Sequence, residues 1–182
     1  MFIIYLGLDR RVERLAHHSL YFQERWARHF RTVFDEPSWP PEPCFYIGCP
    51  SRTDPSVAPE GCENLFLLVP VAPGLRDTDE QRERYAEAVL EHVERVIGER
   101  IRDSIVVRRI YSHRDFASDY NALEGTALGM AHTLRQTAVF RPAHRSAKVS
   151  NLYHTGQYTH PGVGVPMTLI ASEIVRDMIA RG

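Results

Sequence analysis

The sequence predicts an α+β fold, because strand-like and helix-like segments are mixed along the chain without regular β-α-β alternation. The clearest strand is residues 64–71, whose continuous run of Leu, Phe and Val is typical of a central strand. The clearest helix is residues 79–98, where acidic and capping residues precede a regular apolar stripe that Gly98 ends. With 182 residues, the chain can form one domain with a substantial core.

The other expected elements follow from the same two periodicities. Strands are predicted over residues 2–8, 18–22, 44–48, 104–111 and 151–155, and helices over 23–34, in pieces over 115–140, and from Pro166 to about Ala180. The proline-rich run 36–43 predicts an extended loop. Trp26, Phe30 and Phe34 share one face of the helix over 23–34. We expect them to pack in the core, although such a face also suits a membrane interface.

The composition is that of an ordinary globular protein, with 43% hydrophobic and 25% charged residues. A net charge of −1 leaves no overall field to attract nucleic acid or an anionic membrane. Of the 22 Lys and Arg residues, all but Lys148 are arginines. An excess of arginine suits phosphate recognition, but it is better explained by genomic base composition. The apolar start, residues 2–8, is too short for a signal peptide or a membrane span, and its abruptness predicts a truncated chain.

Patterns that bind metals are weak in this sequence. Cys44, Cys49 and Cys62 contain no Cys-x-x-Cys pair, so we expect buried, reduced thiols of a cytoplasmic protein rather than a zinc site. His17 and His18 are adjacent, and on a strand their side chains would point to opposite faces, which prevents joint chelation. The sequence therefore predicts no metal site.

Residues 151–167 carry the strongest indication of a binding site, since they predict a strand, a glycine-rich loop and the start of a helix. Gly156, Gly162 and Gly164 lack the Cβ that would keep a ligand away from the backbone. The free N–H groups of the new helix give that place a positive potential. Such a loop suits a phosphate or the pyrimidine edge of a reduced flavin, but a tight β–α turn without a ligand has the same pattern.

This stretch resembles the C-terminal signature of bacterial-type phytoene desaturases, in which an Asn-Leu-Tyr strand runs into Gly-x-x-Thr-His-Pro-Gly-x-Gly, a hydrophobic residue and Pro. The matching residues are Asn151, Leu152, Tyr153, Gly156, Thr159, His160, Pro161, Gly162, Gly164, Val165 and Pro166. Other segments resemble the family in the same order, at residues 5–8, 16–18, 50–61, 68–73, 120–122, 132–138 and 140–142. The resemblance covers essentially the whole chain, and Gln157-Tyr158 departs from it where many members have small residues.

The resemblance implies an FAD-dependent oxidoreductase of carotenoid biosynthesis, built from a substrate domain and a Rossmann-like FAD-binding domain. Residues 1–145 would form the substrate-domain portion, a sheet with flanking helices. Residues 146–182 would form the strand, loop and helix that return to the FAD-binding domain. The Gly-x-Gly-x-x-Gly motif that holds the ADP half of FAD in this family does not occur in the sequence. We therefore expect only the C-terminal half of such a flavoprotein, a fragment that is inactive and binds no FAD stably by itself.

The resemblance also implies the site residues. Those expected to contact FAD are Gly156, Gln157, His160, Pro161, Gly162, Gly164, Val165, Pro166 and Met167. Those expected to contact substrate are Tyr120, Asn121, Gly125, Phe140 and Tyr158. His160 is the candidate proton handler, against the alternative that it holds the loop by hydrogen bonding, so the catalytic residue stays unassigned. Small residues between 122 and 131 predict either a wall of a substrate tunnel or a close helix contact.

The implied reaction removes two hydrogens across a C–C bond beside a conjugated polyene, with hydride passing to the flavin. The protein would orient the chain and exclude water. The expected partners are a phytoene-like polyene, the missing FAD-binding half and a membrane surface, which makes the protein cytoplasmic and peripheral to a membrane; no nucleic acid is expected. The alternatives are a carotenoid isomerase, ketolase or oxygenase on the same scaffold, or a truncated non-catalytic module that binds lipid or a partner.

Overall fold

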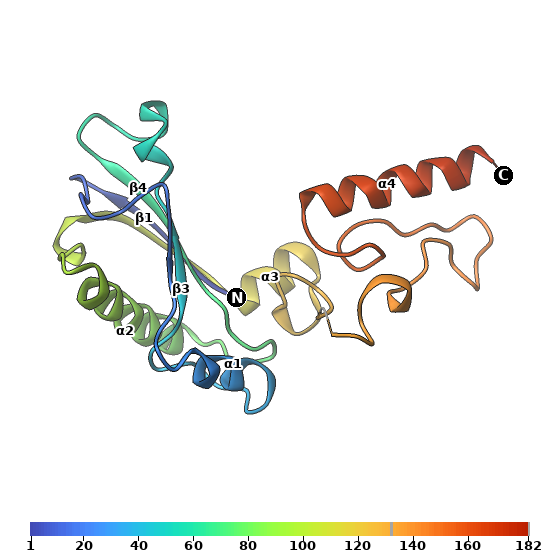
Figure 1. Ribbon diagram of the computed structural model, residues 1–182, viewed down its shortest axis with the longest axis horizontal. Coiled ribbons are helices and arrows are strands. Elements are labelled where there is room, and N and C mark those ends of the chain that lie inside the picture. The colour runs from blue at the N-terminus through green and yellow to red at the C-terminus, as the bar shows by residue number, and fades with distance from the viewer. Residues whose placement is uncertain (132, 182) are drawn as a thin grey trace. The chain divides into compact units, whose positions relative to one another are not determined.

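The computed structural model describes residues 1–131 and 133–181, which belong to two compact units, Met1–Ala127 and Leu128–Gly182 (Figure 1). His132, in one of the family-like segments, lies outside the described residues. The division into units does not test the expected assignment of residues 1–145 to a substrate domain and of 146–182 to a flavin domain. That assignment stays a prediction.

The first unit is built on a five-stranded antiparallel sheet, which confirms the α+β prediction. The strand order is β2-β3-β4-β1-β5. The strands are β1 (Phe2–Leu8), β2 (His18–Tyr21), β3 (Phe45–Gly48), β4 (Glu63–Val69) and β5 (Ile105–Tyr111). The segment expected to be central, β4, lies in the middle of the sheet between β3 and β1.

One face of this sheet is covered by helix α2 (Asp79–Ile97), as Figure 1 shows. The Thr78 hydroxyl caps the helix by accepting a hydrogen bond from the Gln81 N–H, and Gly98 ends it with a φ of 66°, as the sequence predicts. The core between helix and sheet contains Phe2, Ile4, Leu6, Leu8, Leu65, Leu67, Val69, Tyr85, Val89 and Val93. Burial of one such side chain contributes about 1.5–3 kcal/mol, so this packing is what stabilises the unit.

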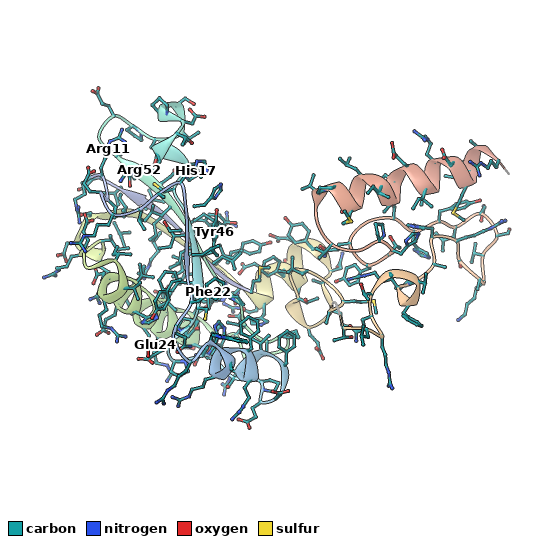
Figure 2. The ribbon with its side chains drawn as sticks, in the orientation of Figure 1. Arg11, His17, Phe22, Glu24, Tyr46 and Arg52 are labelled. Carbon is teal, nitrogen blue, oxygen red and sulfur yellow. The ribbon has the colours of Figure 1, made fainter. Side chains whose placement is uncertain are left out.

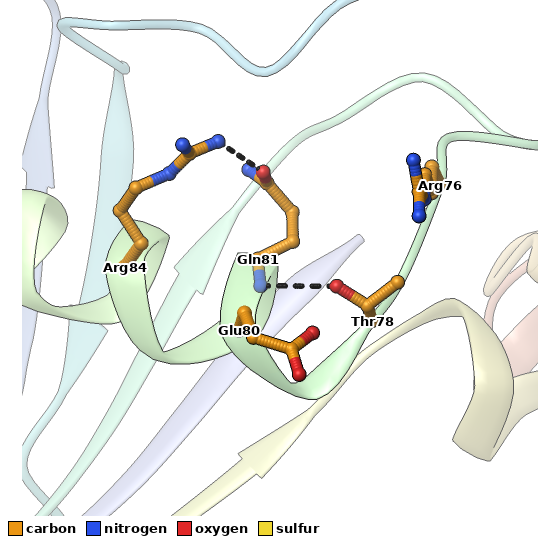
Figure 3. A pocket seen from close by; sticks show the side chains of 5 residues that line it. All are labelled: Arg76, Thr78, Glu80, Gln81 and Arg84. Carbon is orange, nitrogen blue, oxygen red and sulfur yellow. Dashed lines mark hydrogen bonds between the residues drawn. The ribbon is translucent and has the colours of Figure 1, made fainter.

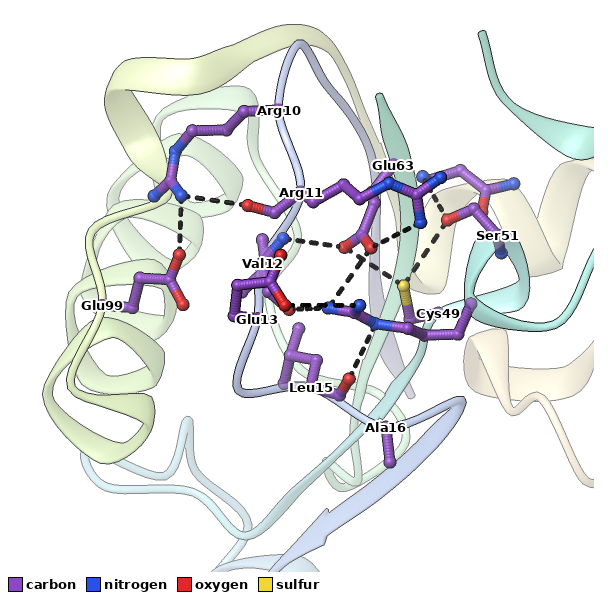
Figure 4. Close-up of polar contacts among 12 residues, drawn as sticks. Arg10, Arg11, Val12, Glu13, Leu15, Ala16, Cys49, Ser51, Glu63 and Glu99 are labelled. Atoms are coloured by element: carbon purple, nitrogen blue, oxygen red, sulfur yellow. Dashed lines mark hydrogen bonds and ion pairs between the residues drawn. The ribbon is translucent and has the colours of Figure 1, made fainter. Parts of the chain in front are cut away.

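A buried carboxylate fixes the connection between β1 and β2 (Figure 4). Glu63 is 1% exposed; one of its oxygens accepts a hydrogen bond of 3.1 Å from the Val12 N–H, and the other lies 3.4 Å from Arg52 Nη2. Arg52 in turn donates to the Val12 carbonyl oxygen. Closer to β2, the Cys49 N–H donates to the His17 carbonyl oxygen at 2.8 Å. These bonds determine where the connection enters β2.

Helix α1 (Trp26–Phe34) contradicts the expectation that its aromatic face packs in the core. Trp26 is 54% exposed, Phe30 38% and Phe34 63%, and the three rings contact one another in a row on the surface. The buried side chain is His29, whose Nε2 donates to the Pro70 carbonyl oxygen at 2.7 Å. A buried polar contact therefore helps to attach this helix, and the aromatic side remains outward.

Beyond β5 the chain is less helical than the sequence predicts. Helix α3 (His113–Tyr120) ends at Asn121, which has a left-handed φ of 51°. Residues 122–131 form no α-helix, so their small side chains do not share a helix face. Gly125 is buried beside His113, where an added Cβ would lie 2.4 Å from the carbonyl oxygen. The helix face expected as a tunnel wall or packing surface is not formed.

The second unit contains helix α4 (Val165–Ala180), whose start beside Pro166 confirms the prediction. The strand expected over residues 151–155 is not formed, because Tyr153 makes only an isolated bridge to Arg145. One residue further along on each side, the Ser146 N–H donates to the Leu152 carbonyl oxygen at 2.9 Å, and the residues between them form the turn. The hairpin is too short to make a strand.

Three buried histidines predict that the free energy of unfolding falls in mild acid. His29, His92 and His113 each donate from Nε2 to a backbone carbonyl oxygen, and desolvation on burial lowers the pKa of all three. The unfolded chain then binds protons at a higher pH than the folded one. The stabilisation is therefore complete above the ordinary histidine pKa of 6.5 and decreases as pH falls from there toward the lowered folded values.

The measurement is the urea midpoint between about pH 8 and about pH 5. The variant carrying His29→Gln, His92→Gln and His113→Gln provides the control and should show a flatter profile. A native midpoint that stays level across this range would contradict the prediction.

Candidate functional site

The glycine-rich loop of the second unit leaves space beside its backbone. Gly156, Gly162 and Gly164 have φ values of 111°, 134° and 119°, which residues with side chains rarely adopt. A Cβ at Gly156 would meet nothing within 4 Å, and one at Gly164 would meet only Met167 Cγ, at 3.9 Å. A flat group can therefore approach the backbone at both positions.

The first turn of α4 follows directly after these glycines. No side chain among the described residues caps the helix, and the Thr168 N–H donates to the Gly164 carbonyl oxygen at 2.9 Å. The N–H groups of Val165 and Met167 precede the first intrahelical bond and so have no acceptor within the helix, and Pro166 has no N–H. Two donors without an acceptor inside the helix, together with the positive end of the helix dipole, thus lie next to the open backbone.

Two buried side chains hold the loop in place. Arg141, 5% exposed, donates to the carbonyl oxygens of Gln157 and Met130 at 2.9 and 3.1 Å. Thr159, 2% exposed, donates to the Gly156 carbonyl oxygen at 3.0 Å. The sequence interpretation did not assign Arg141 to the site, because no periodicity marks an arginine in a loop as buried. Its place in the family-like segment 140–142 was the only signal.

His160 contacts a second histidine that sequence reasoning also missed. The rings of His160 and His144 meet edge to face, with centroids 4.8 Å apart. His144 is 4% exposed and donates from Nδ1 to the His154 carbonyl oxygen at 3.0 Å. Its Nε2 is then an acceptor with no partner among the described residues. Among the described residues, His160 also makes no hydrogen bond by which it could hold the loop.

The expected substrate residues are divided between the two units. Tyr120 is 70% exposed at the end of α3, and Asn121 and Gly125 shape the turn after it. In the second unit, Phe140 is 67% exposed, and the Tyr158 ring packs against Gly129. Because the five residues belong to both units, the substrate site expected from them stays a prediction.

The sheet of the first unit has a second apolar face, away from α2, where Figure 2 shows the side chain of Tyr46. Cross-strand partners share a face, so the strand register defines two rows on it. We call this surface the open face; its rows are Leu20, Tyr46, Leu68, Ile3 and Tyr111, and His18, Gly48, Phe66, Tyr5 and Arg109. Leu20 is 68% exposed and Tyr5 41%, although the exposed face of an antiparallel sheet usually carries polar residues.

Four rings follow one another across the open face. The centroid of His18 lies 5.9 Å from Tyr46, that of Tyr46 lies 6.0 Å from Phe66, and that of Phe66 lies 5.5 Å from Tyr5. At the β2 end, the His18 Nδ1 is 2.7 Å from the Tyr46 hydroxyl. The aromatic row of the open face thus lies between the hydrogen-bonded pair of His18 and Tyr46 at β2 and the Arg109 side chain on β5.

The expectation that His17 and His18 point to opposite faces is wrong. Their ring centroids lie 4.2 Å apart, because His17 precedes β2 and does not follow the strand alternation. The His17 Nδ1 is 2.6 Å from the Thr53 hydroxyl, so each histidine has its own oxygen partner. Among the described residues, no group of three or more His, Cys, Asp or Glu side chains is placed to hold a metal ion.

A hollow of about 320 Å³ lies at the start of α2 (Figure 3). It is lined by Arg76, Thr78, Glu80, Gln81 and Arg84. Arg84 donates to the Gln81 side chain, and the Gln81 N–H donates to the Thr78 hydroxyl at 3.2 Å. These groups cap the helix and bond to one another, so the hollow has a structural explanation.

Known proteins match the chain over almost its whole length. A carotenoid 3,4-desaturase of Haloarcula japonica is 52% identical over 94% of this chain, a zeta-carotene-forming phytoene desaturase of Myxococcus xanthus is 34% identical over 98%, and a 4,4'-diapolycopene oxygenase of a Methylomonas species is 32% identical over 97%. The chain spans 35%, 35% and 36% of these relatives, about a third of their length. No family model matches the sequence. These relatives confirm the resemblance read from the sequence motifs.

Replacing Arg141 should loosen the glycine-rich loop. In Arg141→Met, the carbonyl oxygens of Gln157 and Met130 lose a charged donor, which costs about 1.5–3 kcal/mol per bond. We expect hydrogen exchange of the amides in residues 156–164 to accelerate by roughly tenfold or more, as measured by mass spectrometry. Arg145→Met is the matched control, because Arg145 is exposed and its hydrogen bond in the described ranges goes to Ser150 of its own hairpin. Equal exchange in the two variants would contradict a loop-holding role.

Proposed function

We propose, because this chain belongs to the carotenoid and phytoene desaturase family, that it forms the C-terminal part of an FAD-dependent enzyme that introduces double bonds into a long polyene. The observation that carries this proposal is the similarity to such enzymes over 91–98% of the chain. Residues 1–145 would belong to the substrate domain, and residues 146–182 would return to a Rossmann-like FAD-binding domain. Activity then requires the other two thirds of the protein.

The glycine-rich loop fits the isoalloxazine end of a flavin. A polar, flat ring system would use the open space at Gly156 and Gly164 and the N–H groups of Val165 and Met167, which have no acceptor within the helix. It would also use the His144 Nε2, which has no partner among the described residues. When bound, the flavin would accept hydride from the substrate. The donors at the start of α4 would favour the negative charge that this transfer brings to the ring.

The open face is the surface on which we place the polyene. The opposite face of the same sheet forms the core with α2, so the apolar side chains of the open face are not needed for that core. The row of His18, Phe66 and Tyr5 crosses four strands, or about 14 Å at the usual strand spacing, because the fifth strand places Arg109 in it. In the other row, Ile3 and Tyr111 are buried against Phe116 and Ala122. A rigid conjugated chain lying along such a row would be shielded from water over much of its length, and the protein would need mainly to orient it.

An oxygenase is the second candidate, because one matched relative carries that name. The 4,4'-diapolycopene oxygenase of Methylomonas is 32% identical over 97% of this chain, close to the value for several phytoene desaturases. The desaturase assignment is favoured because the 52% identity of the Haloarcula japonica carotenoid 3,4-desaturase is considerably higher.

Helix α1 supports contact with a membrane surface. Trp26, Phe30 and Phe34 present a continuous aromatic side to solvent, and aromatic residues of this kind bury well at the boundary of lipid headgroups and acyl chains. None of the helices in the described ranges is long and apolar enough to cross a membrane. We therefore propose a peripheral attachment through α1, which would suit a substrate that dissolves in lipid.

A chimera tests the desaturase function. This chain replaces the corresponding third of the Haloarcula japonica relative, and the product is analysed after expression with that relative's carotenoid substrate. We expect the chimera to bind flavin and to add double bonds, whereas the 182-residue chain expressed alone should leave the carotenoid unchanged and show no flavin absorbance. A folded, flavin-loaded chimera that leaves every carotenoid unchanged would contradict the proposal.

Vesicle binding tests the role of α1. In the chimera, Phe34→Glu should reduce co-sedimentation with phosphatidylcholine and phosphatidylglycerol vesicles by about tenfold or more, since burial of one Phe contributes about 1.5–3 kcal/mol. Leu123→Glu is the control, because Leu123 is 77% exposed but lies outside α1. Equal binding by both variants would exclude α1 as the attachment site.

A further inference from the structure

We propose that the rings of Tyr46, Phe66 and Tyr5 stabilise the positive charge that develops on the polyene during its oxidation. The proposal rests on the proposed function, in which the polyene loses hydride while it lies on the open face. It adds a catalytic role for three side chains of this chain, because shielding the polyene from water requires only an apolar surface and not an aromatic one.

Hydride loss makes the polyene transiently cationic. Transfer of one hydrogen with two electrons from a carbon to an oxidised flavin leaves a positive charge there, and the conjugated chain spreads this charge over neighbouring carbons. Loss of a proton from the adjacent carbon to water then forms the double bond. The polyene has thereby lost two hydrogens, and the flavin has gained one hydrogen and two electrons. Groups that stabilise the charged chain more than the neutral one accelerate this step.

The two rows of the open face contain no carboxylate that could offset such a charge. Aromatic and aliphatic side chains, His18 and Arg109 occupy their positions, and Asp and Glu do not occur there. The face of an aromatic ring carries negative potential and attracts a cation that lies within about 6 Å of the ring centroid. This attraction increases where water is excluded, as it is beneath a bound polyene. Rings are therefore what these rows offer to a cation.

Tyr46 turns one face of its ring away from the sheet. A Cβ at Gly48 would lie 2.8 Å from the Tyr46 hydroxyl oxygen and 3.3 Å from the ring carbon that bears it. The ring therefore lies along its own strand, over Gly48. The hydrogen bond of 2.7 Å between its hydroxyl and His18 Nδ1 holds it in this position. A ring that lies on the sheet presents a face, and not an edge, to a ligand on the same surface.

Phe66 and Tyr5 continue the row without forming a closed stack. The plane of Phe66 is inclined by 62° to that of Tyr46, and the plane of Tyr5 by 50° to that of Phe66. Parallel rings would cover the faces of their neighbours, whereas inclined rings leave part of each face uncovered. Tyr5 is 41% exposed, and Phe66 and Tyr46 are half-buried. The three rings thus accompany a polyene from β3 to β1, along which its charge is spread.

A contact between a cation and a ring already exists on the open face. Arg109 Cζ lies over the Tyr111 ring, 5.8 Å from its centroid. The two residues belong to β5 and occupy one position in each row. A ring of this surface thus holds a positive charge in the way proposed for the substrate. The fixed charge of Arg109 also disfavours a second cation at the β5 end, so the charge on the polyene is stabilised over Phe66 and Tyr46.

Fluorinated phenylalanines test this role at nearly constant ring size. In the chimera described above, Phe66 is substituted in turn by mono-, di- and trifluorophenylalanine, which progressively remove negative potential from the ring face. Tyr46→Phe is the baseline for the same series at Tyr46. Flavin reduction is followed by its absorbance on anaerobic mixing with the carotenoid. We expect its rate to fall stepwise, by roughly threefold to tenfold over the series, while the dissociation constant of the carotenoid stays within about twofold.

Phe45 provides the matched control. It directly precedes Tyr46 in β3, but its side chain belongs to the core on the α2 side of the sheet. The same three substitutions at Phe45 should leave the rate of flavin reduction unchanged. If the row acted only as an apolar surface, the series at Phe66 and Tyr46 would be as level as the one at Phe45. That result would overturn the proposal.

A binding measurement separates this proposal from the proposed function. A polyene that ends in a trimethylammonium group is compared with its uncharged tert-butyl analogue, which has nearly the same shape. Fluorination of Phe66 should weaken binding of the charged compound relative to the uncharged one by roughly threefold. If the chimera oxidises no carotenoid but this ratio still shifts, the desaturase function fails and the affinity of the rings for a cation stands. If the chimera is active but neither rate nor ratio responds, the desaturase function stands and the role of the rings is overturned.

Discussion

The contacts of the buried Glu63 carboxylate with four neighbours hold the segments around the start of β2. Burying a carboxylate is costly unless polar groups replace the water it loses. Here the Val12 N–H and the Cys49 thiol donate to Oε2, while Oε1, which accepts no hydrogen bond among the described residues, is ion-paired with Arg52 and Arg11. All four lie on segments that flank the start of β2, so the same contacts that offset the charge also fix that start. The position of the polar end of the open face is therefore a consequence of electrostatics inside the unit.

A sheet with two apolar faces exposes apolar side chains to water unless other groups cover both faces. Helix α2 covers one face with a regular stripe, and its capping residues alone account for its bounds. Within the first unit, the other face keeps Leu20 and Tyr5 substantially exposed. In the second unit, α4 likewise keeps apolar side chains at the surface, since Leu169 and Ile179 are 63% and 58% exposed.

Local patterns predicted most of the fold, and distant contacts account for what they missed. Thr78 and Gly98 mark both ends of α2 in the sequence because capping depends on the nearest few residues. The outward aromatic side of α1 was not predictable, because helical spacing shows which residues share a face but not which face meets the core. The glycine-rich loop was located from its own residues, whereas Arg141 and His144 were not, since their burial depends on how the loop folds back over them.

The adjacent histidines show how a single residue outside a strand changes the chemistry of a face. Had His17 belonged to β2, alternation would have turned it away from His18. Because the strand begins at His18, the two rings lie together, and each is held by a hydroxyl from a different part of the chain. Neither hydroxyl can be matched to its histidine from sequence, since Thr53 and Tyr46 are brought there only by the pairing of β2 with β3. Polarity at this end of an apolar sheet therefore results from register, and register is also what would align a long, rigid ligand with it.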